Sequence, residues 1–326
     1  MTRSAVQLGS ILVIVIFLIA WYLPQDKQPV YRATLDDVPA FRAEIEQSIA
    51  SLGPTKAYAA FKTSYQQAKP SVRHTAAHLF GESLYSSQKL EGVRTCDAEM
   101  NFGCYHGFFT KAVTNEGLDV ISLLDNECGA TSRASACQHG IGHGILEYIG
   151  HTRLTEALAA CAHTNQPNPL AGCTSGVFME YNVPAVTDER GVASVEARPL
   201  IDPEDPYAPC FSIDPGVAAS CFHELPQWWK QVYHGDFKRM SGFCARIPDL
   251  TDREACFSGI GKIVGSSTNY SVEDTKKLCA TLGGREEEST CLLEAAGSFV
   301  ADAGDYSGAA LLCASVSPER QGSCLY

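Results

Sequence analysis

SVEDTKKLCATLGGREEESTCLLEAAG, residues 271–297, contains every part of a unit that recurs through this chain. An amphipathic segment with apolar positions three and four residues apart ends at Cys279, and this spacing predicts a helix. A short polar turn follows, and Cys291 opens a second apolar segment. Ser271 and Asp274 have the spacing of a helix N-terminal cap, as do Thr251 and Glu254 in the unit before. The stretch therefore predicts two helices whose facing ends each carry a cysteine.

The fourteen cysteines form seven such couples in chain order. Members of a couple lie 8 to 12 residues apart, and the second members recur every 33 to 36 residues, with one step of 48. A constant period of this size indicates a helical repeat array. We expect each couple to form a disulfide that adds about 2 to 3 kcal/mol of stability by closing a short loop. The expected bonds are Cys96–Cys104, Cys128–Cys137, Cys161–Cys173, Cys210–Cys221, Cys244–Cys256, Cys279–Cys291 and Cys313–Cys324.

The fold class that follows is an all-α, disulfide-stapled array of helical hairpins, either an α-solenoid or a curved superhelix. In unit length it resembles the tetratricopeptide repeat, but the tetratricopeptide consensus is absent. A glycine inside a helix costs about 1 kcal/mol relative to alanine, so we expect the glycines of the second helices to permit close helix approach on an inner face. They include Gly107, Gly140, Gly142, Gly176, Gly259 and Gly261.

The chain divides into three regions. Residues 1–35 contain an apolar run of 16 uncharged residues at 8–23, followed by a polar tether. Residues 36–92 predict three helices without cysteines, at 36–52, 54–68 and 71–89, which would cap the array. Residues 93–326 hold the seven repeats, interrupted at 182–209 by an insertion rich in proline and acidic residues that predicts a surface loop or lid.

The apolar run sets the expected location. It is short for a spanning helix and long for a signal-peptide core, and no small-residue cleavage site follows it. We interpret it as an uncleaved signal anchor, with a cleaved signal peptide as the alternative. The body would then lie outside the cytoplasm, in the periplasm or the extracellular space, where disulfides persist. A formal net charge of −12 argues against nucleic acid as a partner.

The histidines carry the functional hypothesis. Two segments share one pattern, HTAAHLFGE at 74–82 and HGIGHGILE at 139–147, in which two histidines and a glutamate follow one another at intervals of four. That interval places side chains one helical turn apart, where two imidazoles can bind one metal ion. Stacked units would add His106, so we expect a zinc or iron site on the inner face. The expected ligands are His74, His78, His106, His139 and His143, with Glu82 and Glu147 as ligands or as partners that orient an imidazole. His151, one turn further on, is expected to meet solvent.

Several readings of this pattern remain open. The protein could be a metal-dependent enzyme, a hydrolase or an oxidoreductase. It could instead be a rigid scaffold that binds a protein or peptide on its concave face, with the histidines hydrogen-bonded in a polar groove and no metal. Haem held by two histidines is a third possibility. The sequence does not specify the reaction or the substrate.

Overall fold

A computed structural model describes residue 31 and residues 35–131, 133–165, 170–182 and 204–324 of the chain. Within these ranges every regular element is a helix, in agreement with the predicted class. The three cysteine-free helices come first, and each has a proline among its first two positions, where the missing N–H is not needed. They are α2 (Val38–Leu52), α3 (Pro54–Tyr65) and α4 (Pro70–Gln88), close to the predicted bounds.

The remaining helices are short outer ones and longer inner ones, which alternate along the chain from α5 to α9 and again from α10 to α15. The outer helices are α6 (Ile121–Cys128), α8 (Leu154–Ala160), α11 (Phe237–Cys244), α13 (Val272–Cys279) and α15 (Tyr306–Cys313). The inner helices after α4 are α5 (Gly103–Glu116), α7 (Ala134–Ile149), α9 (Cys173–Asn182), α10 (Pro215–Val232), α12 (Leu250–Ser267) and α14 (Arg285–Ser298). Short 3-10 turns η1 (Lys89–Thr95), η2 (Leu118–Val120), η3 (His151–Arg153) and η4 (Cys161–His163), a π-helical turn η7 (Phe299–Ala303) and α16 (Pro318–Cys324) complete the described chain.

All seven predicted disulfides are present, and no cysteine in the described residues is free. Four outer helices end at the first cysteine of a couple, as expected. The second cysteine lies in the first turn of α5, α7 and α9. In α10, α12 and α14 it lies in the second turn, because these helices begin six residues before it rather than at it.

Two helix caps were predicted from the sequence, and one of them is present in the structure. Ser271 caps α13 as predicted, since its side chain accepts a hydrogen bond from the backbone N–H of Asp274 at 3.3 Å. The cap predicted at Thr251 is wrong. Asp249 caps α12 instead by accepting from the N–H of Asp252 at 3.1 Å, and Thr251 is already inside the helix.

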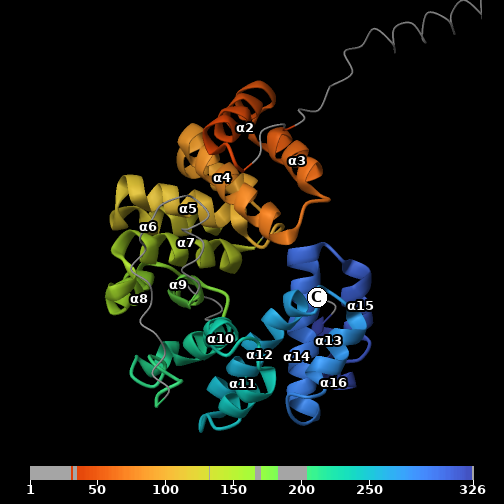
Figure 1. The fold of residues 1–326 in the computed structure, drawn as a ribbon. Helices are drawn as coiled ribbons and strands as arrows, with labels where there is room; N and C mark the ends of the chain where they lie inside the picture. The colour runs from red at the N-terminus through yellow and green to blue at the C-terminus, as the bar shows by residue number, and fades with distance from the viewer. Residues whose placement is uncertain (1–30, 32–34, 132, 166–169, 183–203, 325–326) are drawn as a thin grey trace, which may run out of the picture.

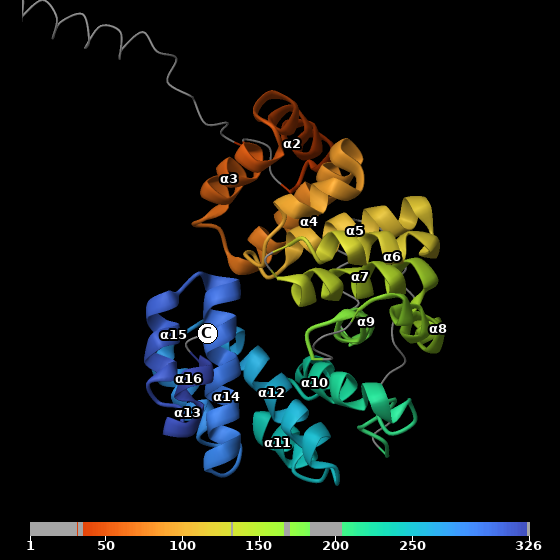
Figure 2. The ribbon, with the colours of Figure 1, turned by 180° about the vertical axis from the view of Figure 1, so that it is seen from behind.

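The inner helices form one continuous row, because α4, α5, α7, α9, α10, α12 and α14 each contact the next in this order. Figures 1 and 2 show the row curving through the molecule, with the outer helices on its convex side. Glycines let neighbouring backbones touch, as predicted. A Cβ atom on Gly107 would lie 1.9 Å from the carbonyl oxygen of His78, and one on Gly176 would lie 1.9 Å from that of His139.

The two ends of the row meet. The backbone N–H of Asn101, in the turn between α4 and α5, donates to the carbonyl of Ala301 in η7 at 3.2 Å. The guanidinium of Arg73 on α4 donates to the carbonyl of Asp302. Figure 1 shows the last helices returning to the N-terminal end of α4, so the row follows a closed path.

Some predictions fall on residues that the structure does not describe. The apolar run 8–23 lies outside the described residues, as do most of the tether 24–35 and most of the insertion 182–209. Among the helices that are described, none is both long enough and apolar enough to cross a bilayer.

Candidate metal centre

Five of the predicted ligands come together on the inner row. Three neighbouring inner helices supply them: His74 and His78 from α4, His106 from α5, and His139 and His143 from α7. The glycine after His106 explains how they meet, because it lets α5 approach the backbone of α4 at His78. The five side chains form two groups of three whose ring nitrogens lie within 4.8 Å of one another, and His106 belongs to both.

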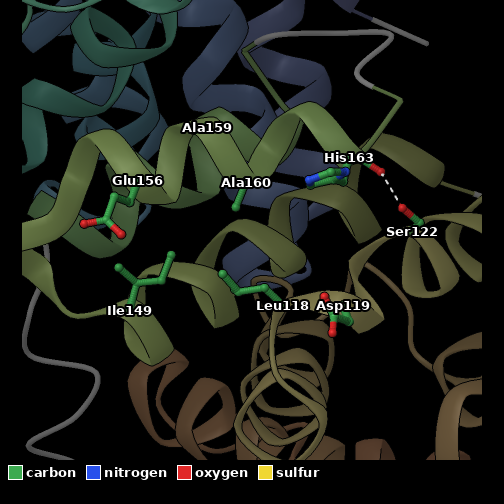
Figure 3. A pocket seen from close by; sticks show the side chains of 8 residues that line it. All are labelled: Leu118, Asp119, Ser122, Ile149, Glu156, Ala159, Ala160 and His163. Carbon is green, nitrogen blue, oxygen red and sulfur yellow. Dashed lines mark hydrogen bonds between the residues drawn. The ribbon is translucent and has the colours of Figure 1, made fainter.

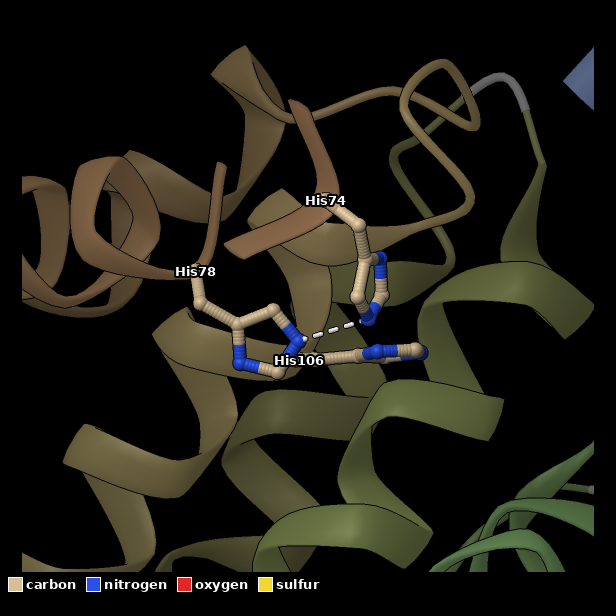
Figure 4. A group of neighbouring side chains, drawn as sticks. All are labelled: His74, His78 and His106. Carbon is tan, nitrogen blue, oxygen red and sulfur yellow. Dashed lines mark hydrogen bonds between the residues drawn. The ribbon is translucent and has the colours of Figure 1, made fainter. Parts of the chain in front are cut away.

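The first group, His74, His78 and His106, has the dimensions of a three-histidine metal site (Figure 4). Metal–nitrogen bonds of about 2.05 Å at tetrahedral angles place ligand nitrogens about 3.3 Å apart and imidazole centroids about 5.2 Å apart. The Nε2 atoms of His74 and His78 are 3.1 Å apart. The three centroid separations are 4.6, 5.3 and 5.2 Å, with the rings steeply inclined to one another.

The second group, His106, His139 and His143, is less regular. The Nε2 atoms of His139 and His143 are 3.2 Å apart, and their rings are separated by 4.9 Å. His106 lies 5.7 Å from His139 but only 4.0 Å from His143, with the latter two rings inclined by 34°. This group therefore contains one well-formed pair and a looser third member.

One histidine in each pair is oriented by a hydrogen bond from its other nitrogen. The Nδ1–H of His74 donates to the carbonyl of Met100 at 3.1 Å, which leaves Nε2 without a proton. This Nε2 accepts a hydrogen bond from the Nε2–H of His78 at 3.1 Å and could bind a metal ion instead. The Nδ1–H of His143 donates to the carboxylate of Glu180 on α9 at 2.9 Å. Such partners fix the ring orientation of metal-binding histidines and raise their basicity.

His106 differs from the other four. Its side chain is buried, with 1 % of the residue exposed, and neither ring nitrogen has a hydrogen-bond partner. A buried polar group left without a partner costs about 1 to 3 kcal/mol. A fold that places such a ring between two histidine pairs fits a site in which metal coordination satisfies the nitrogens.

Burial keeps three of these imidazoles neutral at pH 7, those of His74, His106 and His139. Burial lowers the pKa of His74 to about 4, although its hydrogen bond to Met100 opposes the shift. Burial also lowers the pKa of His106 and His139 well below the ordinary range, and the nearby His143 adds to both shifts. Neutral imidazole is the form that binds metal ions, so the site is ready for a ligand at neutral pH.

The metal-free protein should therefore lose stability in mild acid. A histidine whose pKa is 6.5 unfolded and about 4 folded takes up its proton more readily when unfolded, so stability falls as the pH drops through this window. His74 alone accounts for about 3 kcal/mol at the acid end. Urea unfolding in the presence of a chelator, measured from pH 7 to pH 4.5, checks this, and stability that is constant or rises toward pH 4.5 would contradict it.

Two variants separate the contributions to this pH dependence. His74→Gln should flatten the loss, because the neutral amide takes up no proton. Asp302 acts in the opposite sense: burial raises its pKa to about 6, so it adds stability as the pH falls from about 6 toward 3.8. Asp302→Asn should therefore steepen the loss of stability in acid.

The predicted glutamates lie beside the cluster with other partners. Glu82 accepts from Arg42 at 2.5 Å, and Glu147 accepts from the hydroxyl of Thr110 at 2.6 Å. Neither belongs to the two groups of converging ligand atoms in the described residues. The carboxylate that contacts an imidazole of the cluster is Glu180. The sequence did not predict this role, although Glu180 follows Gly176 in the segment CTSGVFMEY at 173–181, one of the second helices expected to line the inner face.

The expectation that His151 meets solvent is wrong. His151 is 5 % exposed, and its Nε2–H donates to the backbone carbonyl of Glu180 at 3.2 Å. Gly150 ends α7 with a φ of 97°, so the chain turns and brings His151 back onto α9 instead of continuing the helix. Burial would raise the pKa of the Glu180 carboxyl, but the hydrogen bond from His143 and the nearby imidazole of His151, 3.6 Å away, outweigh it and lower the pKa to about 2.

A second polar cluster continues the inner row beyond α9. Glu224 on α10 is fully buried and accepts hydrogen bonds from Ser175 at 2.7 Å, from His223 at 2.9 Å and from the ammonium of Lys262 at 2.9 and 3.0 Å. Burial opposes ionisation of Glu224, but the charges of Lys262 and His223 hold its pKa well below the usual range. Because both of its oxygens already have partners, the Glu224 carboxylate forms a structural ion pair with Lys262 beside the histidines and is not available to bind a metal ion.

An open cleft of about 410 Å³ lies apart from the histidine cluster (Figure 3). Its lining includes Leu118 of η2, Ile149 at the end of α7, Glu156 of α8 and His163 of η4. His163 is exposed, and its carbonyl accepts from Ser122 at 3.5 Å. None of these residues belongs to the groups of converging ligand atoms found in the described chain, so the cleft is separate from the candidate metal centre.

Comparison with known proteins adds no information on the site. No family model matches this chain, and no curated protein or solved structure matches it either.

Proposed function

We propose that this protein binds zinc through His74, His78 and His106. The observation that carries the proposal is the first group's geometry, in which three imidazoles have nearly the spacing of tetrahedral zinc ligands. Iron(II) sites with open positions usually require a carboxylate beside two histidines, and both converging groups contain histidine alone. The donor set therefore favours zinc over iron.

Three histidine ligands suggest a catalytic rather than a structural role. Structural zinc sites use four protein ligands, whereas catalytic sites keep one position for water or substrate. His74 is the least buried of the three, which would leave an approach to that position. We therefore place the protein among zinc-dependent enzymes of the hydrolytic class, where the metal lowers the pKa of bound water.

Haem is less well supported by the same distances. A haem iron held by two histidines takes its ligand nitrogens from opposite faces of the porphyrin. Here each pair projects from one helix with its Nε2 atoms only 3.1 and 3.2 Å apart, which leaves no room for a porphyrin plane between them. A rigid scaffold that binds a protein or peptide remains the competing function, and metal content distinguishes it from the proposal.

We further propose that the body is a helical repeat array on the oxidising side of a membrane, attached through residues 8–23. The disulfide in every couple supports this, because such bonds persist in exported proteins. The recurring contact between consecutive inner helices supports the array.

The test is zinc content, measured by mass spectrometry on protein purified from an oxidising compartment. The wild type should carry at least one zinc per chain. His78→Gln and His106→Gln should each retain less than a tenth of the zinc in the first site, because each removes one of three ligands. His163→Gln changes an exposed histidine of the outer cleft and should match the wild type. Negligible zinc in all four proteins would contradict zinc binding and favour the competing function, a rigid scaffold that binds a protein or peptide.

A further inference from the structure

His139 and His143 form a pair that the first zinc ion does not use. Both side chains are buried, and their Nε2 atoms face each other at 3.2 Å, the separation of two ligands on one ion. Glu180 accepts the Nδ1–H of His143 at 2.9 Å and is itself 2 % exposed. A carboxylate behind a histidine is the usual support for a metal ligand. The second pair is thus built like the first, with its own orienting partner.

His106 connects the two pairs. Its ring lies 5.2 Å from that of His78 and 4.0 Å from that of His143. An ion in the first group takes one nitrogen of His106 and leaves the other buried without a hydrogen-bond partner. An ion in the second group would take that remaining nitrogen.

We propose that the protein binds two zinc ions side by side, with His139 and His143 holding the second ion and His106 giving one ring nitrogen to each. This inference rests on the proposed function, because it adds a second ion to the first. Bridging forms one new zinc–nitrogen bond and breaks the N–H bond of His106, whose proton passes to solvent. The bridging imidazolate and the Glu180 carboxylate each carry one negative charge, and together they balance part of the positive charge of the two zinc ions.

The second ion binds more weakly than the first. The first group already has nearly tetrahedral spacing, whereas the rings of His106 and His143 are closer and more nearly parallel than that geometry requires. Binding the second ion therefore has to turn a ring within a closely packed row. Zinc should be taken up in two steps and removed by a chelator in the reverse order.

The experiment is a titration of the full-length, metal-free protein with zinc chloride against a competing chelator. The wild type should bind two zinc ions in two resolved steps. Glu180→Gln keeps the size of the side chain but removes its charge, and should weaken only the second step by 10 to 100 fold. Glu156→Gln is the matched control, since Glu156 is exposed on α8, where its carboxylate pairs with Arg153, and it does not belong to the histidine groups of the described chain. It should titrate like the wild type.

Each outcome decides between the two proposals. One zinc per chain, lost in His78→Gln and unchanged in Glu180→Gln and His143→Gln, would overturn the second site and leave the first intact. No zinc in the wild type would overturn the proposed function itself.

A second readout tests the bridge directly. With copper(II) in both sites, an imidazolate bridge couples the two unpaired electrons, so the low-temperature paramagnetic resonance signal should account for well under half of the bound copper. A signal equal to the copper content would show two ions without a shared ligand and would overturn the role assigned to His106.

Discussion

Gly107→Ala should destabilise the protein by more than 3 kcal/mol and abolish zinc binding together with it. The added Cβ would lie 1.9 Å from the carbonyl oxygen of His78 and 2.6 Å from its carbonyl carbon. Overpacking against side chains typically costs about 1 to 3 kcal/mol because side chains can yield. Here the obstacle is backbone, so α5 must move away from α4 and carry His106 with it.

The matched control is Gly297→Ala. Gly297 is also helical, in α14, but it is exposed and an added Cβ would meet nothing within 4 Å. Alanine should stabilise this position by up to about 1 kcal/mol through helix propensity. Urea unfolding and zinc content of the two variants provide the comparison. Equal stabilities, or a Gly107→Ala protein that keeps its zinc, would show that the close approach of α4 and α5 does not assemble the site.

Reduction of the seven disulfides should abolish cooperative folding at room temperature. Each bond closes a short loop and contributes about 2 to 3 kcal/mol, and domains of ordinary size have a net stability of only about 5 to 15 kcal/mol. Loss of all seven contributions exceeds that margin. Circular dichroism during thermal unfolding, with and without reductant, measures the effect, and a sharp transition under full reduction would refute it.

Removal of a single disulfide shows how much stability one bond contributes. The double variant Cys313→Ser with Cys324→Ser opens the last couple, where α16 ends in Cys324. It should unfold cooperatively with a loss of about 2 to 3 kcal/mol. A loss as large as that of full reduction would mean that the couples do not contribute independently.

The helices and disulfides could be predicted because they depend on spacing along the chain. The cysteines of a couple are close in sequence and the couples recur at a nearly constant interval, so pairing within each couple was the simplest prediction. All seven disulfides agree with it. The convergence of His74, His78, His106, His139 and His143 followed from the same period, since equivalent positions in stacked units become neighbours.

The role of Glu180 could not be predicted in the same way. An interval of four residues exceeds one helical turn by about 40°, so Glu82, two such intervals from His74, lies about 80° around α4 from it. Glu82 accepts a hydrogen bond from Arg42 instead. Glu180 reaches His143 from α9, the next inner helix, and that contact depends on how far one helix is shifted along another. Sequence spacing fixes the order of the helices but not this shift. The turn at Gly150, which buries His151, could not be predicted either, because helical periodicity does not show where a helix ends and the chain turns back.

The hydrogen bonds that join η7 to the start of α4 and α5 change how this molecule can come apart. A linear array loses its end units first, because each end unit has only one neighbour and opens at little cost in free energy. Here Asn101 and Arg73 are held by Ala301 and Asp302 from the last inner segment, so both ends of the inner row have a second neighbour. Amide hydrogen exchange should then show no gradient of protection from either end toward the middle. Arg73 is also the residue next to His74, so truncation of the chain after α14 would be felt at the histidines more than two hundred positions away in sequence.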